Sequence, residues 1–208
     1  MGDSTPKQFF PLKEKIIANY SLEIFISLPY VKNITIVCEQ KFQKFFLKSS
    51  KISFSLPGKR RQDSVKNGFT SLRQKAAYIC IHDAARPLVK KENIDKVFHA
   101  AQIHKAAALA VKATSTMKLA KEMRVLKTLD RNMIWEVQTP QILETSLFAK
   151  GLHYIQEEGL TVTDDLSIIE ALGLPTYLVE GCPSNIKITY PNDLQLAENY
   201  LCRSKHTN

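Results

Sequence analysis

Short runs of apolar residues recur along the chain and predict the strands of a buried sheet. Isoleucine, valine and threonine are frequent in these runs, as is typical of β-strands. Several runs show no alternation with polar residues, which predicts strands that are buried on both faces. The expected strands are Asn33–Glu39, Tyr78–Asp83, Ala106–Thr114, Thr176–Gly181 and Asn185–Tyr190.

Between these runs, apolar residues recur at the three- and four-residue spacing of amphipathic helices. Three such series are Ile17, Tyr20, Ile24 and Leu28; Val65, Phe69 and Leu72; and Ile94, Val97, Phe98 and Ala101. Residues that cap and charge helix N-termini predict two further helices. Thr163-Asp164-Asp165 precedes LSIIEAL, and Asn192-Asp193 precedes LQLAENYL.

The alternation of strands and helices predicts an α/β fold with a mostly parallel sheet and helices on both faces. We expect one domain over residues 1–208, since a chain of this length supports a single core. Ligands of such sheets bind at the carboxyl ends of the strands. The turn-forming residues Gly2 to Pro6 come just before Lys7 with no strand in front, so we expect the sheet to lack its first strand.

One segment fits this alternation poorly. Met117 to Arg131 is rich in charged residues and follows Thr114, Ser115 and Thr116. This pattern predicts either a surface hairpin or an arm that serves a neighbouring subunit.

The composition is that of an ordinary globular protein, and the chain carries a net positive charge. Apolar residues make up 44% and charged residues 24%, and 29 Lys and Arg against 20 Asp and Glu give a net charge of +9. This balance favours an anionic partner. Because no nucleic-acid motif is present, we rank a small phosphorylated ligand above nucleic acid, with a solvated basic face as the alternative.

Cysteine usage and the absence of targeting signals bear on the compartment. The four cysteines, Cys38, Cys80, Cys182 and Cys202, form no CxxC pair and no metal spacing, which predicts buried, reduced thiols. The sequence shows no signal peptide, membrane span or myristoylation pattern. We expect a cytoplasmic protein that binds neither membrane nor nucleic acid.

The sharpest candidate site is IHDAARP, which places polar residues just past an apolar strand. Asp83 is suited to Mg²⁺, which takes few protein carboxylates and completes its octahedron with phosphates and water. Arg86 could orient a phosphate or close the turn. The structural alternative is a local ion pair between Asp83 and Arg86, with His82 as a hydrogen-bonded neighbour.

Three further cationic or polar segments could bind an anion. PGKRRQDSVKNGF joins a turn at Gly58 to Asp63 and Ser64 just before a helix, which suits either an anion or base contact or plain helix capping. Lys7 could neutralise a triphosphate or be an ordinary surface lysine. Lys187 lies inside an apolar run, so we expect it to reach a ligand or a carboxylate.

Six motifs follow one another in order: PKQFFPL, RRQDSV, HDAARP, TLDRNMIWEVQTPQ, TDDLSIIEALG and NIKITYPNDLQLAE. From Met1 to about Leu201 the chain resembles the 2-C-methyl-D-erythritol 4-phosphate cytidylyltransferases of the non-mevalonate isoprenoid pathway. The resemblance implies a Rossmann-like nucleotidyltransferase fold. It also implies transfer of CMP from CTP to 2-C-methyl-D-erythritol 4-phosphate with Mg²⁺, releasing pyrophosphate. The substrate phosphate would attack the α-phosphorus in line, with Lys187 stabilising the charge that builds there.

The same resemblance assigns the nucleotide-binding residues. Lys7 would contact the triphosphate as a second catalytic lysine. Ser64 and the loop before it, including Gly58, would contact the cytosine. Asp83 would bind the metal and the nucleotide, and Arg86 would belong to the nearby polar network. Some relatives carry an acidic residue where this chain has a serine at position 184, so no further metal ligand is carried over.

The resemblance also implies a homodimer in which an arm at about residues 114–137 closes over the partner's sugar phosphate. Thr116 and Lys118 would lie on this arm, and Arg131 and Thr139 would flank its return. We expect all four to bind substrate, with Arg131 gripping the substrate phosphate of the other protomer.

The beginning of the chain departs from the family pattern. Family members begin with a strand and a loop of the type AAGxGxRM, and Met1 and Gly2 align with the end of that loop. We therefore expect a start codon assigned too late. Losing a central strand leaves its two neighbours with unpaired backbone groups, so a chain that begins at Met1 should fold poorly and turn over little CTP.

Two other functions remain alternatives at this stage. One is a pentitol phosphate cytidylyltransferase, such as those that use ribitol 5-phosphate. The other is a non-catalytic remnant without the glycine-rich CTP loop.

Overall fold

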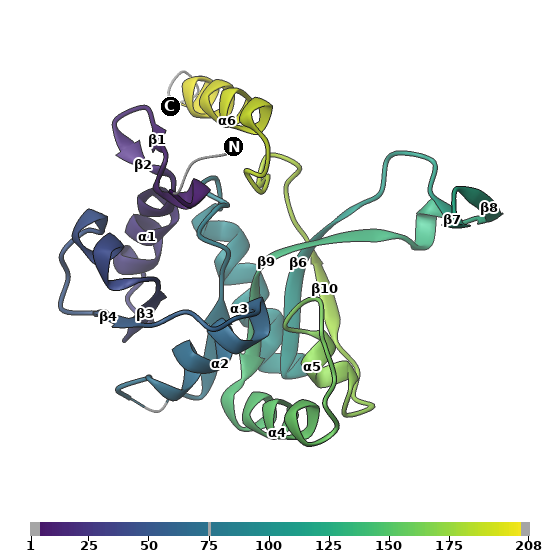
Figure 1. The fold of residues 1–208 in the computed structure, drawn as a ribbon, viewed down its shortest axis with the longest axis horizontal. Helices are drawn as coiled ribbons and strands as arrows, with labels where there is room; N and C mark the ends of the chain where they lie inside the picture. The colour runs from purple at the N-terminus through teal and green to yellow at the C-terminus, as the bar shows by residue number, and fades with distance from the viewer. Residues whose placement is uncertain (1–4, 75, 205–208) are drawn as a thin grey trace.

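The computed structural model describes residues 5–74 and 76–204, which form an α/β fold (Figure 1). Met1 to Ser4, which include the first of the turn-forming residues Gly2 to Pro6, lie outside the described residues. Three short 3₁₀ helices cover Lys7–Phe9, Gln40–Phe45 and Arg131–Met133. The helices are α1 Ile17–Ser27, α2 Arg61–Thr70, α3 Lys91–His104, α4 Thr145–Glu157, α5 Ser167–Glu170 and α6 Pro191–Ser204. The strands are β1 Pro11–Leu12, β2 Lys15–Ile16, β3 Ile34–Val37, β4 Ile52–Ser55, β5 Tyr78–Ile81, β6 Ala106–Lys112, β7 Lys118–Lys121, β8 Arg124–Thr128, β9 Trp135–Glu144 and β10 Tyr177–Glu180.

A four-stranded sheet in the order β10–β6–β9–β5 lies at the centre of the fold. β10 pairs with β6 in parallel, whereas β9 runs antiparallel to both β6 and β5. Three strands therefore share one direction, as the sequence predicts, but two of the three pairings are antiparallel. The apolar-run pattern misses β9, because its buried Gln138, Thr139 and Gln141 are polar side chains that are hydrogen-bonded inside the protein.

Helices cover both faces of this sheet, as expected. Alternate residues of β6 point to opposite faces, so Ala106 and Ala108 pack with α4 and α5, and Ala107 and Leu109 pack with α3. Phe148 of α4 is fully buried on the first face and meets Phe69 of α2 edge-on. These two apolar layers hold the sheet, and with it the carboxyl ends of β5, β6 and β10, in a fixed position.

A second, smaller sheet pairs β3 with β4 in parallel. Within the described residues β3 pairs only with β4, and β5 pairs only with β9. Each of these two strands therefore has one paired edge and one unpaired edge. The sequence-based expectation of two neighbouring strands with unpaired backbone groups matches this arrangement.

The prediction of a strand at Asn185–Tyr190 is wrong. Within residues 5–74 and 76–204, this segment belongs to no strand and makes one long-range backbone hydrogen bond to the rest of the fold, from Ile188 N to Ala85 O at 2.8 Å. Ile188 is buried against Leu12, Ile17 and α6, which anchors the segment by packing and not by a hydrogen-bonded ladder. The apolar residues of this segment reflect its burial. A strand and an extended segment anchored by packing show the same pattern of apolar residues in the sequence.

The segment that fits the alternation poorly forms a hairpin. β7 and β8 pair antiparallel through a turn at Glu122 and Met123, both with positive φ, and protrude from the ends of β6 and β9 (Figure 1). Every residue of both strands is exposed. We call β7, β8 and their turn the arm hairpin.

Two other expectations concern the cysteines and membranes. Cys38 is buried as predicted, but Cys80 and Cys202 are exposed, so the expectation of buried thiols is wrong for these two. Among the described helices, none has the length and apolar character needed to cross a membrane.

Candidate functional site

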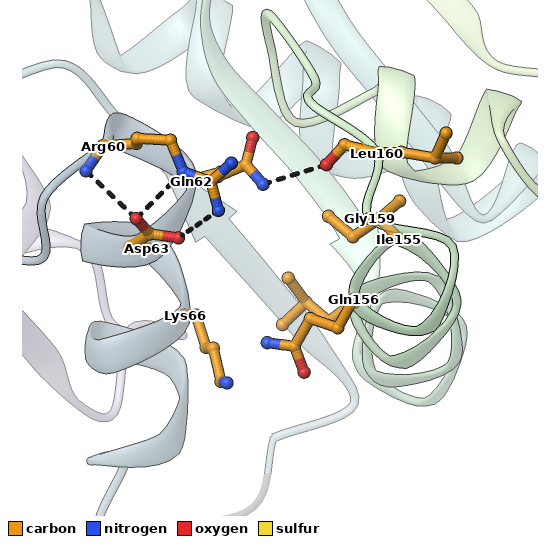
Figure 2. A pocket seen from close by; sticks show the side chains of 9 residues that line it. Arg60, Gln62, Asp63, Lys66, Ile155, Gln156, Gly159 and Leu160 are labelled. Carbon is orange, nitrogen blue, oxygen red and sulfur yellow. Dashed lines mark hydrogen bonds and ion pairs between the residues drawn. The ribbon is translucent and has the colours of Figure 1, made fainter.

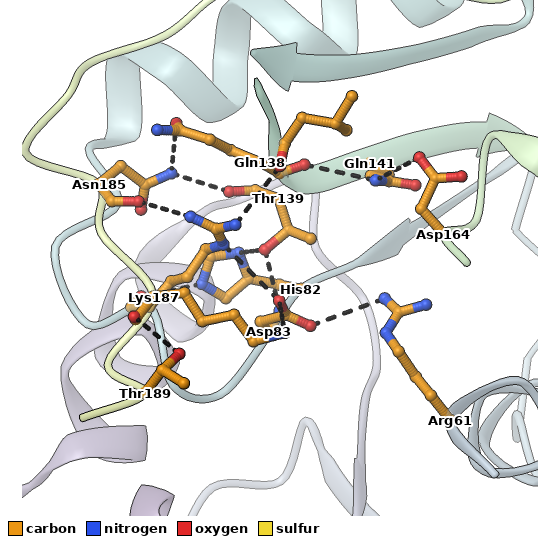
Figure 3. Close-up of polar contacts among 12 residues, drawn as sticks. Arg61, His82, Asp83, Gln138, Thr139, Gln141, Asp164, Asn185, Lys187 and Thr189 are labelled. Atoms are coloured by element: carbon orange, nitrogen blue, oxygen red, sulfur yellow. Dashed lines mark hydrogen bonds and ion pairs between the residues drawn. The ribbon is translucent and has the colours of Figure 1, made fainter. Parts of the chain in front are cut away.

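Asp83 stands at the carboxyl end of β5 and is the centre of a polar network (Figure 3). Its carboxylate lies 2.9 Å from Lys187 Nζ and 3.6 Å from both Arg61 Nη2 and Arg86 Nε, with 16% of the side chain exposed. Burial alone would raise the pKa of Asp83. The charges of Lys187, Arg61 and Arg86 outweigh burial and hold that pKa below its ordinary value, so the carboxylate is ionised near neutral pH. The alternative of a local ion pair with Arg86 is correct, but Arg86 is only one of three cationic partners.

Arg86 braces the turn after β5 against the Asn185–Tyr190 segment. Its Nη1 donates to Asn185 O at 2.8 Å, and Nη2 donates to Val137 O at 3.5 Å. The fully buried amide of Asn185 donates in turn to Gln138 Oε1 and Thr139 O. Arg86 therefore has its hydrogen-bonding groups directed mainly at backbone carbonyls, which suits a side chain that positions its neighbours.

His82 and Thr139 hold the backbone of Asp83. His82 Nε2 lies 3.1 Å from Arg86 O, which can only accept, so Nε2 carries the proton. Thr139 Oγ1 accepts from Asp83 N at 3.0 Å and therefore donates to His82 Nδ1 at 3.1 Å. Burial lowers the pKa of His82 to about 4, so the ring is neutral at physiological pH and can accept this bond. Thr139, which the resemblance assigns to substrate binding, thus has a structural role in this fold.

Arg61 and Asp165 form an ion pair that the sequence did not reveal. Arg61 Nη1 and Nη2 donate to the two carboxylate oxygens of Asp165 at 2.9 and 2.7 Å, and the Asp165 side chain is 1% exposed. The pair joins the start of α2 to the loop before α5 and holds a guanidinium beside Asp83. The Arg-Arg doublet at positions 60 and 61 was the only sequence signal, and its partner lies 104 residues away.

Lys7 lies beside Lys187. Its Nζ is 3.4 Å from Thr189 Oγ1, two residues beyond Lys187. Burial and the ammonium of Lys187 lower the pKa of Lys7. A repelling pair of ammonium groups in a partly buried position favours the binding of an anion between them.

Gly58 lies in the turn before α2 and contacts Ser64, which lies in the first turn of that helix. Gly58 N donates to Ser64 Oγ at 3.0 Å, and Ser64 Oγ donates to Arg60 O at 3.2 Å. A Cβ at position 58 would lie 2.4 Å from Asp63 Cβ, so only glycine fits against the first turn of the helix. Asp63 Oδ2 accepts from Arg60 N, which confirms the helix-capping alternative for this residue. Ser64 keeps one lone pair for a ligand.

A cavity of about 310 Å³ lies between α2 and α4 (Figure 2). Arg60, Asp63 and Lys66 line one side, and Ile155 and Gln156 line the other. Gln62 ties the two sides by donating to Leu160 O and accepting from Val162 N. Arg60 and Asp63 form an ion pair with each other here, so we interpret this cavity as the gap between two packed helices.

The remaining predicted residues lie on or beside the arm hairpin, which projects away from the four-stranded sheet (Figure 1). Thr116 is exposed before β7, and Lys118 Nζ donates to Thr128 Oγ1 across the hairpin at 2.6 Å. Arg131 is exposed and donates to Thr114 O at 3.3 Å. Within this one chain the structure brings together Lys7, Asp83, Arg86, Thr139 and Lys187, but not the arm residues.

The network can bind a polyanion. Lys7, Arg61, Arg86 and Lys187 supply four positive charges, and Asp83 and Asp165 supply two negative charges. Among the described residues, no group of three or more His, Cys, Asp or Glu side chains could enclose a metal ion. A magnesium ion that arrives with phosphates needs only one or two carboxylates, and the ionised Asp83 fits that requirement.

Comparisons with known proteins agree on one family. The model of the 2-C-methyl-D-erythritol 4-phosphate cytidylyltransferase family matches residues 1–203. The chloroplastic enzyme of that name from Oryza sativa subsp. japonica is 45% identical over 95% of this chain and 69% of that protein. The enzyme of that name from Caldanaerobacter subterraneus subsp. tengcongensis is 36% identical over 97% of this chain and 92% of that protein. A Francisella tularensis crystal structure of that name has TM-score 0.86 and 31% identity, over 94% of this chain and 93% of that one.

Proposed function

This chain belongs to the 2-C-methyl-D-erythritol 4-phosphate cytidylyltransferase family, and from that premise we propose how its residues carry out the reaction. The function is transfer of CMP from CTP to 2-C-methyl-D-erythritol 4-phosphate in isoprenoid biosynthesis. The phosphate of the sugar alcohol attacks the α-phosphorus of CTP, a new P–O–P bond forms, and pyrophosphate leaves. One observation carries the assignment of the site: four cationic side chains gather around Asp83 at the carboxyl end of β5.

Lys187 stabilises the negative charge that builds on the α-phosphoryl oxygens. Its side chain is 42% exposed and its ammonium is held 2.9 Å from Asp83, so the side chain is both fixed and accessible to a ligand. A compact positive charge held in place before the reaction costs no reorganisation when the transition state forms. Lys7, beside Lys187, neutralises the departing pyrophosphate.

Asp83 orients Lys187 in the free enzyme and would hold the Mg²⁺ that accompanies CTP. The ion would neutralise phosphate charge and polarise the α-phosphoryl oxygen. Bound triphosphate offers Lys187 and Arg61 new anionic partners, which leaves the carboxylate oxygens of Asp83 available. His82, Thr139 and Arg86 keep the Asp83 turn in place during this exchange.

Ser64 and Gly58 contact the cytosine. The hydroxyl of Ser64 is fixed by two hydrogen bonds and lines the same cavity as Asp83 and Lys187. A fixed hydroxyl and nearby backbone groups can distinguish the exocyclic group of cytosine from that of uracil.

The chain acts as a homodimer, with the arm hairpin reaching the partner's site. Met123, Val125 and Leu126 are exposed on the arm hairpin, an unusual content of apolar residues for a solvated hairpin. Thr116, Lys118 and Arg131 are presented on the same projection, where they would meet the sugar phosphate bound to the other protomer.

Pyrophosphate release in four reactions tests this function: CTP or UTP, each combined with 2-C-methyl-D-erythritol 4-phosphate or ribitol 5-phosphate. We expect release only with CTP and the methylerythritol phosphate, and only with Mg²⁺ present. Turnover of ribitol 5-phosphate instead would assign the chain to the pentitol group. Specific CTP binding in calorimetry without release in any reaction would support a non-catalytic protein.

A further inference from the structure

Lys187 lies in an extended segment that belongs to no strand within the described part of the chain, yet its Nζ is held 2.9 Å from the Asp83 carboxylate. Two buried residues bracket it. Ile188 follows directly and is anchored by packing and by its bond to Ala85 O. Asn185 lies two residues before and is fully buried. Because Ile188 fixes one side only, the placement of Lys187 also depends on what holds Asn185.

Asn185 is held by a chain of two buried side-chain amides (Figure 3). Its Nδ2 donates to Thr139 O at 2.9 Å and to Gln138 Oε1 at 3.0 Å, and Gln138 Nε2 donates to Cys182 O at 3.2 Å. The chain ends on two backbone carbonyls, which can only accept, so the orientation of both amides is determined. Both N–H groups of the Asn185 amide are used inside the fold and none remains for a ligand.

A bulge in β9 supplies the acceptors of this amide chain. The register of β9 with β6 shifts between Ala108 and Ala110, where three residues of β9 oppose one of β6. Gln138 and Thr139 lie in the bulge and are buried. A bulge takes residues out of the regular ladder and re-aims their side chains. The bulge therefore leaves Gln138 and Thr139 O to bind Asn185.

The segment is also tied to the turn that carries Asp83. Asn185 O accepts from Arg86 Nη1 at 2.8 Å, and Ala85 O accepts from Ile188 N at 2.8 Å. Both partners lie within three residues of Asp83 in the sequence. The turn and the segment are thus joined on both sides of the lysine, so a shift of Asn185 moves the lysine ammonium relative to the carboxylate.

We propose that Asn185 and Gln138 are positioning residues that hold Lys187 where the negative charge develops on the α-phosphoryl group. The inference rests on the proposed function of Lys187 and extends it to two side chains that act through the lysine. A preorganised charge stabilises a transition state only from the correct place. A displacement of about 1 Å can lower a rate on the order of 10²-fold. Loss of either amide should therefore lower kcat more than it changes KM.

Steady-state kinetics of the full chain test this order of action. Asn185→Ala should lower kcat at least tenfold and change KM for CTP less than threefold. Gln138→Met keeps the side-chain length and should lower kcat about threefold, which covers the case in which Asn185→Ala folds poorly. The matched control is Asn19→Ala, since Asn19 is also buried and donates to a backbone carbonyl, Phe45 O, at 3.0 Å. It should lower Tm similarly and leave kcat unchanged.

Combination with Lys187→Ala separates positioning from a general structural role. Once the lysine ammonium is gone, Asn185→Ala and Gln138→Met should each lower kcat less than twofold further. The same fold loss in the presence and absence of Lys187 would overturn the proposal.

Acetylation by sulfo-N-hydroxysuccinimide acetate tests the placement of Lys187 without turnover. An ammonium held by a carboxylate reacts slowly, and peptide mass spectrometry measures the rate for each lysine. Lys187 should react at least threefold faster in Asn185→Ala and Gln138→Met than in the wild type or Asn19→Ala, with exposed Lys150 unchanged. Equal rates at Lys187 in all four proteins would overturn the proposal. Faster labelling in a chain that releases no pyrophosphate would refute the proposed function and still support placement of Lys187 by the two amides.

Discussion

The network around Asp83 and the arm hairpin differ in how their side chains are held. Asp83, Arg86, Thr139 and Asn185 are buried or nearly so, and each contacts at least two other groups of the same chain. On the arm hairpin every strand residue is exposed, and Met123 is 96% exposed. The side chains around Asp83 are held in place before any ligand binds. The side chains of the arm hairpin become packed only when another surface covers them. Variants of the first should therefore act within one protomer, and variants of the second should act between protomers.

Lys187→Ala should have the largest effect. Removing one preorganised positive group from a site of developing negative charge should lower kcat about 10²- to 10³-fold. Lys187→Arg should restore only part of the rate, because a planar guanidinium does not replace a compact ammonium. Steady-state pyrophosphate release measures both, with exposed Lys150→Ala on α4 as the control. A change in KM alone would show that Lys187 contributes to substrate binding and not to stabilisation of the transition state.

Arg61→Met should be the most destabilising change. It leaves the carboxylate of Asp165 buried without its bidentate partner, which should lower the free energy of unfolding by about 3 kcal/mol. The double variant Arg61→Met/Asp165→Leu should lose less, since no unpaired charge remains. Urea denaturation of both variants measures the difference. If the double variant lost as much unfolding free energy as Arg61→Met and Asp165→Leu lose together when each is measured alone, the pair would not couple the two segments.

The ion pair of Arg61 and Asp165 is also a feature that the sequence alone did not predict. Continuous apolar runs predict β3, β5, β6 and β10, but the expected burial on both faces holds only for β6, since β3 and β5 are partly buried and β10 is mostly exposed. Asn185–Tyr190 has the same pattern but is buried by packing alone, so the pattern could not exclude a strand. IHDAARP indicated Asp83 and Arg86 because both lie within one turn. The partners of that turn, Arg61 and Asp165, come from distant segments that only the folded chain brings together.

Asp83→Asn should change how stability depends on pH. The pKa of Asp83 is lowered on folding, so its contribution is fully present above the unfolded value of about 3.9 and is lost as pH falls through the folded value. The variant should be less stable than the wild type at pH 7, and the gap should narrow below about pH 4. Chemical denaturation from pH 3 to pH 7 measures it. A constant gap over that range would show that the cationic cluster does not stabilise the carboxylate.

Arg131→Ala should raise KM for the sugar phosphate about tenfold, with an unchanged Tm, because the side chain is exposed in its own protomer. Mixing this variant with Lys187→Ala provides the sharper test. If Arg131 serves the partner's site, a mixed dimer has one site with both residues intact, and activity should rise above that of either variant alone. No recovery after exchange of subunits would place Arg131 in its own protomer's site.

Met123→Ser should have the smallest effect on folding, within about 0.5 kcal/mol, because the side chain packs on nothing in its own chain that would be lost. It should nevertheless shift the equilibrium toward monomer in concentration-dependent light scattering. A large loss of Tm in dilute protein would contradict the division between the two regions.

The cavity of about 790 Å³ that borders β3 and β5 shares part of its lining with the network around Asp83. Arg61, Ser64, Asp83 and Lys187 all border the same cavity as the unpaired edges. Thermodynamic linkage then applies to any two ligands that meet there. If a compound bound beside β3 and β5 changes the affinity for nucleotide by some factor, the nucleotide must change the affinity for that compound by the same factor, so the two measurements report one coupling free energy.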